Sequence, residues 1–107
     1  MEFVTSEISK KLKEKGFPLV DYIPTISQAL KWLRDERCFH VSPDLICDYS
    51  MDDDGNICEE WTYWSYSIHH IIDGVLYRDY NQFDHIEYKS YEEAAIAGIE
   101  YVLDNLI

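Results

Sequence analysis

The spacing of hydrophobic and polar residues changes along the chain, and each change marks a different kind of element. From Thr5 to Lys15 and from Ile26 to Glu36, hydrophobic residues recur at the spacing of amphipathic helices. From Cys38 to Tyr80 they mostly alternate with polar residues, which is typical of β-strands. Helical spacing returns from Tyr91 to about Asn105. The pattern predicts two helices, a group of strands and a final helix.

Short capping signals define where these helices begin and end. Gly16 follows the first helix, where a Schellman turn needs a left-handed residue, and Phe17 would then pack back onto Leu12. Trp32 lies off the apolar stripe of the second helix, so it either covers a neighbouring element or marks a surface contact. Two capping boxes predict the starts of the other helices: Thr25 with Gln28, and Ser90 with Glu93.

The segment from Glu60 to His70 is rich in aromatic residues and predicts the middle strand of a small sheet. Asp54-Gly55 precedes it and predicts a two-residue type I′ turn. Pro43 cannot donate a ladder hydrogen bond, so the first strand is expected at an edge or a bulge. Counting outward from the turn aligns one face of both strands, which we expect beneath the second and final helices: Cys47 opposite Thr62, Leu45 opposite Trp64 and Val41 opposite Ile68.

A second turn signal, Asp73-Gly74, predicts a third strand over residues 75–80. A strict two-residue turn would pair Ile68 with Asp79, whereas a three-residue loop would pair Tyr66 with Tyr80. The sequence leaves this register open. Residues 81–84 predict a turn, and residues 85–88 are a candidate extension of the sheet.

The predicted elements make a single α+β domain over residues 1–107, in the order α-α-β-β-β-α. We expect a three-stranded antiparallel meander with the second helix and the C-terminal helix on one face. Hydrophobic residues make up 47% of the chain, which is enough for a core without disulfides, metals or cofactors. Without its first helix the order matches double-stranded RNA-binding domains, but topology alone does not transfer function. The sequence does not indicate which face of the sheet the first helix covers.

The net charge of -12 is concentrated after residue 37. Residues 1–37 hold seven of the nine Lys and Arg residues, so the remainder carries 15 acidic residues against Arg78 and Lys89. Nucleic acids are bound chiefly through Lys and Arg, so direct nucleic-acid binding is disfavoured. The charge permits a basic protein partner or mimicry of nucleic acid, and it also keeps the domain soluble.

No segment reaches the roughly 20 consecutive apolar residues of a membrane helix, and the N-terminus lacks the apolar block of a signal peptide. We therefore expect a cytoplasmic protein without membrane contact. Cys38, Cys47 and Cys58 form no paired motif, and we expect them to be reduced and partly buried.

Three segments of the chain resemble a group of short uncharacterised proteins from gut Bacteroides-type bacteria and their phages or prophages. They are TISQALKWLRDE (25–36), KSYEEAAIAGIEYVLDNLI (89–107) and KKLKEKGF (10–17). The resemblance is close over about a third of the chain and looser elsewhere. It implies common ancestry and a phage or mobile-element accessory role. It implies no activity and no functional residues.

The segment from Asp52 to Ile57 resembles the middle of a calcium-binding loop. Aligning Gly55 with the invariant glycine puts Ser50 at the first ligand position and Trp61 at the twelfth, where a glutamate is needed. We therefore interpret the segment as an acidic hairpin tip.

The predicted register also sets His40 opposite His69 on the outer sheet face, with Cys38 two residues from His40. Three such ligands could hold zinc, or a thiol and an imidazole could act as nucleophile and base. No acidic group to orient a histidine and no oxyanion donor is evident. We interpret these residues as separate polar strand residues and keep a metal or thiol site as the second alternative function.

The outer face further groups Ile46, Trp61 and Tyr63, with Asp48 opposite Trp61. Aromatic anchors are typical of protein interfaces, including homodimers, but the first helix is an alternative cover for this patch. The leading prediction is a small acidic, non-catalytic protein-interaction module of phage or mobile-element origin. The first alternative is a nucleic-acid-mimicking inhibitor of a host DNA-binding protein.

Overall fold

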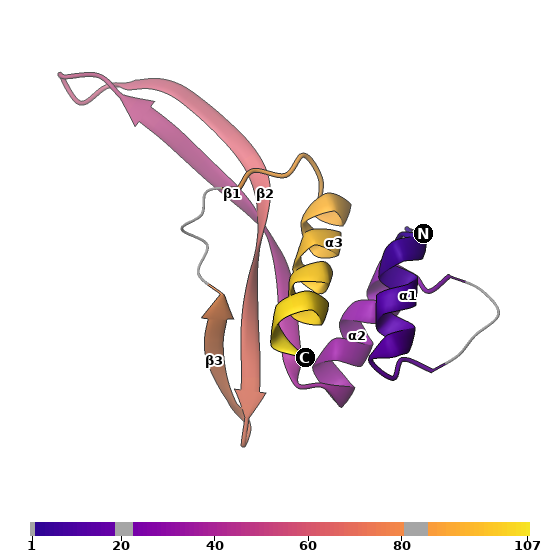
Figure 1. Ribbon diagram of the computed structural model, residues 1–107. Helices are drawn as coiled ribbons and strands as arrows, with labels where there is room; N and C mark the ends of the chain where they lie inside the picture. Colours follow the sequence, from indigo (N-terminus) through magenta and orange to yellow (C-terminus); the bar gives the residue numbers. More distant parts are fainter. Residues whose placement is uncertain (1, 19–22, 81–85) are drawn as a thin grey trace.

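The computed structural model describes residues 2–18, 23–80 and 86–107, and over these residues it has an α+β fold in the predicted order (Figure 1). The sheet is antiparallel and three-stranded, with the strand order β1-β2-β3, so the aromatic-rich strand is central as predicted. The elements are α1 (Ser6–Glu14), α2 (Ile26–Glu36), β1 (Phe39–Met51), β2 (Ile57–Ile72), β3 (Val75–Tyr80), α3 (Tyr91–Tyr101) and a terminal π-helical turn, η2 (Val102–Leu106).

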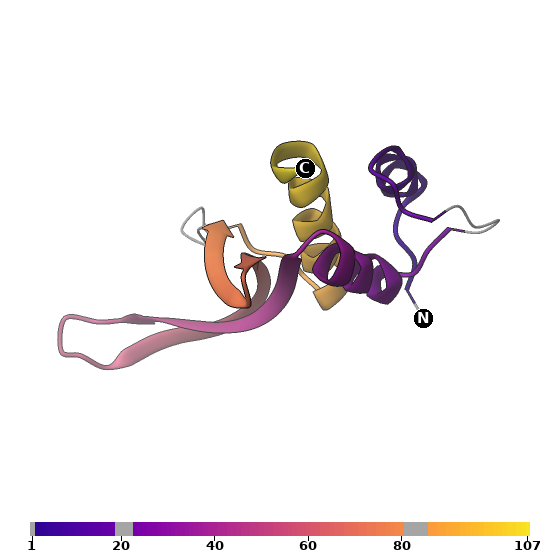
Figure 2. The same cartoon turned by 90° about the horizontal axis from the view of Figure 1, so that it is seen from below.

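The helices gather at the inner end of the sheet, with α1 farthest from the strands (Figures 1 and 2). α3 packs across β1 and β2, α2 packs against β1 and α3, and α1 contacts α3. The first helix therefore adds a further helical layer and does not cover the outer face of the sheet. This position removes α1 as the cover of the predicted outer patch. No helix in the described part of the chain is long and apolar enough to cross a membrane.

The core lies between the three helices and the halves of β1 and β2 nearest to them, which contain the start of β1 and the end of β2. Gly98 of α3 lies directly above the sheet, where an added Cβ would be 2.5 Å from Cγ1 of Val41. This close approach lets α3 bury the sheet residues Phe39, Val41, Tyr66 and Ile68 together with Ile8, Leu12, Leu33, Ile99 and Val102.

The predicted ends of the first two helices are confirmed. Gly16 has a φ of 102°, and the backbone N of Phe17 donates to the carbonyl of Leu12 over 3.0 Å, as in a Schellman turn. The backbone N of Thr25 donates to Oε1 of Gln28 over 2.8 Å, and the return bond to Thr25 Oγ1 spans 3.1 Å. These bonds satisfy backbone groups that a helix end would otherwise leave without partners.

Trp32 covers a neighbouring element, which is one of the two predicted alternatives. Its half-buried ring meets the ring of Phe17 edge-on, with 5.5 Å between centroids. The guanidinium of Arg37 lies 5.9 Å from the same indole. The indole therefore joins α2 to the residue that ends the Schellman turn of α1.

The predicted start of the final helix at Tyr91 is confirmed, but its capping box forms only in part. The Oγ of Ser90 accepts from the backbone N of Glu93, but the Glu93 carboxylate accepts from Lys89 instead of returning to Ser90. The α-helix ends at Tyr101, earlier than predicted, and the chain continues to Leu106 as a π-helical turn.

The register of the first hairpin is confirmed, although the predicted turn is wrong. The chain turns through residues 52–56, and a register shift after Ser50 compensates for the longer loop. Oδ1 of Asp52 accepts from the backbone N of Asp54 over 3.0 Å and of Asn56 over 2.8 Å, which stabilises the loop. The observed pairs include Cys47 with Thr62, Leu45 with Trp64 and Val41 with Ile68.

The second hairpin adopts neither of the two predicted registers completely. Asp73 and Gly74 both have positive φ, 50° and 79°, so this turn is the two-residue type I′ turn. A bulge between Ile68 and His69 then pairs Ile68 with Tyr80 instead of Asp79. The predicted turn at residues 81–84 and His85 lie outside the described residues.

The predicted extension of the sheet is present at one described residue. Tyr88 and Trp64 exchange two backbone hydrogen bonds of 2.8 and 2.9 Å. This bridge lies on the edge of β2 that also carries β3. It brings the chain back to the sheet directly before α3 begins.

The first hairpin projects beyond the helices and beyond β3 as a two-stranded ribbon (Figure 1). We call residues 45–64 the arm. The molecule is consequently elongated, at 58 × 32 × 20 Å. The expectation that Leu45 lies beneath a helix is wrong, because 56% of Leu45 is exposed. Trp64 marks the limit of the helical cover, since its half-buried ring meets Tyr91, the first residue of α3.

Candidate interaction surface

The predicted outer patch is brought together on one face of the arm. Ile46 lies opposite Tyr63, and Asp48 lies opposite Trp61. Trp61 is 39% exposed, while Ile46 and Tyr63 are half-buried. The indole Nε1 of Trp61 donates to Oε1 of Glu87 over 3.0 Å, which ties the ring to the segment before α3. The patch therefore presents a positioned aromatic ring and two partly covered neighbours.

The opposite face of the arm carries a second apolar surface that sequence reasoning missed. It lies on the face that α3 covers nearer the core, at the end of the sheet beyond the helix, and we call it the outer stripe. It consists of Leu45, Cys47, Tyr49, Thr62 and Trp64. Leu45 is 56% exposed and Tyr49 is 55% exposed. A length comparison could have found it, because an eleven-residue helix spans about 16 Å whereas a sixteen-residue strand spans about 50 Å. The final helix is too short to cover the hairpin.

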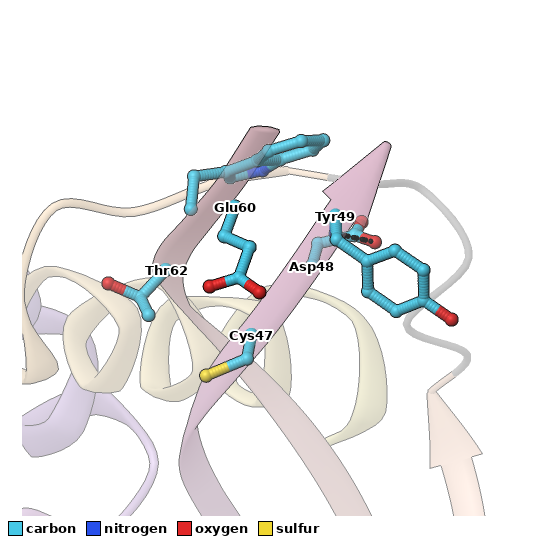
Figure 3. Close-up of a pocket in the computed structure, with 6 residues that line it drawn as sticks. Cys47, Asp48, Tyr49, Glu60 and Thr62 are labelled. Carbon is cyan, nitrogen blue, oxygen red and sulfur yellow. Dashed lines mark hydrogen bonds between the residues drawn. The ribbon is translucent and has the colours of Figure 1, made fainter. Parts of the chain in front are cut away.

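Two shallow hollows lie along the arm, with volumes of about 400 and 410 Å³. Figure 3 shows the first, where the Glu60 carboxylate lies above Cys47, with Thr62 on one side and Tyr49 on the other. The second adjoins it and is lined by Leu45, Tyr63 and Trp64 together with the segment from Glu87 to Lys89. Most residues lining the first hollow are exposed, so it suits a partner surface better than an enclosed small molecule.

The arm is strongly acidic and has no compensating basic residue. No Lys or Arg occurs from Cys38 to Tyr77. The acidic residues of the arm are Asp48, Asp52, Asp53, Asp54, Glu59 and Glu60, and all of them are exposed. The resulting field attracts basic partners and repels nucleic acid and other acidic surfaces.

The predicted Cys38, His40 and His69 cluster forms only in part. His40 and His69 are paired across the strands, with 6.4 Å between ring centroids. Cys38 precedes β1 with a left-handed φ of 63°, which breaks the alternation that the register assumed. Within residues 2–18, 23–80 and 86–107, no three His, Cys, Asp or Glu residues are grouped to hold a metal ion.

The environment of His40 lowers its pKa from the ordinary value of 6.5. Burial is the largest cause, followed by the neighbouring His69 and then Arg34, while Asp44 acts in the opposite direction. The ring nitrogen Nδ1 of His69 is itself buried without a hydrogen-bond partner in the described structure. Burial of His40 therefore favours its neutral form.

The three cysteines are more exposed than predicted. Cys38, Cys47 and Cys58 are all free thiols on the surface. Cys47 and Cys58 lie on the arm, where neither strand is covered by a helix, and this explains the difference from the predicted partial burial.

The tip of the arm has the structure of an acidic turn. Gly55 has a φ of 84°, and the side chain of Asp52 accepts backbone hydrogen bonds within the loop. This arrangement uses the carboxylate of Asp52 to hold the turn. It accords with the interpretation of the segment as a hairpin tip.

No protein-family model matches the chain, and no curated protein or solved structure is significantly similar to it.

Proposed function

We propose that the protein is a non-catalytic protein-interaction module that binds its partner through the arm. The observation that supports this function is the exposure of large apolar side chains on both faces of a ribbon that projects from the core. The exposed set is Leu45, Tyr49, Met51, Ile57 and Trp61. Apolar surfaces of this kind, rimmed by polar residues, are typical of interaction sites.

The energetics of the arm favour the same function. A two-stranded ribbon is only marginally stable by itself in water, and the core of this protein is complete without the outer half of the hairpin. Exposed aromatic residues are costly to keep in water but are the usual anchors of interfaces. Binding through the arm would bury them.

The function is tested by shortening the arm. Replacing residues 47–62 by Asn-Gly would join the paired residues Ile46 and Tyr63 through a type I′ turn. We expect this variant to keep its fold by circular dichroism and to lose the partners that wild type captures from a host lysate. Leu76→Ala, which alters an exposed residue of β3 outside the arm, is the matched control and should retain them. Retention of every partner by the folded, shortened variant would refute the proposal.

A further inference from the structure

We propose that the outer stripe of the arm binds an amphipathic helix of a partner protein, and that this helix carries Lys or Arg beside its apolar face. The inference rests on the proposed interaction function. It specifies which face of the arm is used and the chemistry of the partner.

The outer stripe is the continuation of a surface that the protein already covers with a helix. On the same face, Val41 and Tyr66 lie beneath α3, and exposure rises from 4% at Val41 to 56% at Leu45. The change occurs where α3 begins, at the edge-to-face contact of Trp64 with Tyr91. The apolar face of the sheet is therefore longer than its helical cover.

A partner helix that packs on this face of the arm would bury side chains that a strand added at the edge of β1 leaves exposed. An added strand would pair with the backbone along the edge of β1 and leave the side chains of Leu45 and Tyr49 on the face exposed. A helix lying along the strands on this face would bury these side chains as α3 buries Val41. The distance from Leu45 to Met51 is about 20 Å along the strand. A helix of about 14 residues spans that length.

Charge determines which helix fits. Glu60 lies on the same face as the stripe, Asp48 lines the first hollow together with Cys47 and Tyr49, and Lys and Arg are absent from residues 38–77. A partner helix with basic flanks is attracted to this surface, whereas a second acidic arm is repelled. The lysine-rich helix of this chain, α1, does not fit, because its own apolar stripe is already buried: Val4, Ile8 and Leu12.

The inference is tested with a synthetic amphipathic peptide of Leu and Lys, about 14 residues long. A peptide of identical composition, scrambled to remove the apolar stripe, controls for charge alone. We expect calorimetry to show at least about tenfold tighter binding of the amphipathic peptide, which should gain helical circular dichroism when bound. The double variant Leu45→Thr, Tyr49→Thr should lower the affinity about tenfold, since it removes two anchors but keeps strand propensity and charge. Leu76→Ala, which alters an exposed residue of β3 outside the arm, should leave the affinity unchanged.

Four results would overturn the inference: equal binding of the scrambled peptide, no effect of the double variant, a bound peptide in β conformation, or self-association of wild type that the double variant abolishes. The two proposals fail in distinguishable ways. If the shortened arm loses the natural partner while the double variant keeps it, the interaction function stands and the outer stripe is the wrong face.

Discussion

Val41 lies in direct contact with α3 at Gly98, and an added Cβ would also come within 3.2 Å of the Tyr66 ring. Alanine favours a helix over glycine by about 1 kcal/mol. Overpacking a closed core costs about 1–3 kcal/mol, and Val41 is fixed in its strand. We expect Gly98→Ala to lower the free energy of unfolding by up to about 2 kcal/mol in urea titrations. The double variant with Val41→Ala should show favourable coupling, and a stabilising Gly98→Ala would contradict the close contact.

Alanine substitutions on the face of the sheet that carries α3 should lower stability by different amounts at its two ends. Ile68→Ala removes a fully buried side chain, with 0% exposure, and should cost about 2–5 kcal/mol. Leu45→Ala, farther along the same face, should change stability by no more than about 0.5 kcal/mol because the residue is exposed. Thermal and urea unfolding of the two variants would compare these costs. A large loss for Leu45→Ala would show that the arm folds onto the body in solution.

Stability should fall as the pH drops below 6.5, and His40 should account for part of the loss. Burial and the nearby His69 lower the pKa of His40, so the unfolded chain takes up its proton first as the pH falls from 6.5. The contribution of His40 is therefore present above pH 6.5 and decreases through the lowered pKa. In His40→Gln the unfolding midpoint should depend less on pH across this window. An unchanged pH profile would show that protonation of His40 is not coupled to folding.

The salt dependence of partner binding distinguishes the proposed apolar interface from nucleic-acid mimicry. A protein that replaces a nucleic acid on a basic partner would depend on many ion pairs, and nucleic-acid complexes lose about 10³–10⁵ in affinity between about 50 and 200 mM salt. An interface that uses Leu45, Tyr49 and Trp61 as anchors should lose less than about tenfold, because its buried apolar contacts are not screened. Affinity measured for a captured partner at both salt concentrations decides between the two.

The register counted from Asp54-Gly55 is correct even though the two-residue turn itself is wrong. Asp54-Gly55 indicated a two-residue turn, but the loop is longer, and the shift after Ser50 restores the predicted pairing. Register is strongly specified because a slip of one residue would move Val41 and Ile68 out of the core. Turn geometry is less constrained, since the tip is exposed. The bulge beside His69 was not predicted, because alternation alone does not indicate where an extra residue is inserted.

The arm could not be recognised from alternation, because the inner and outer halves of the first hairpin have the same pattern. Val41 and Leu45 are both apolar residues on the same face, yet one is buried and the other exposed. The difference depends on where α3 begins above the strands. The outer patch of Ile46, Trp61 and Tyr63 was predictable because it follows from register alone. The position of α1 was not, since its apolar stripe fits any apolar surface.

The free edge of β1 has a consequence for the behaviour of concentrated solutions. In the described part of the chain β1 pairs with β2 alone, so the backbone groups along its outer edge can pair with another copy. Pro43 interrupts this edge near the base of the arm and the register shift at Met51 interrupts it near the tip, but between them mutual repulsion of carboxylates keeps the edges apart. This protection ends when salt screens the repulsion, since the Debye length falls to about 3 Å at about 1 M ionic strength. High ionic strength is therefore the condition under which these arms should join edge to edge, and light scattering would detect the resulting assemblies.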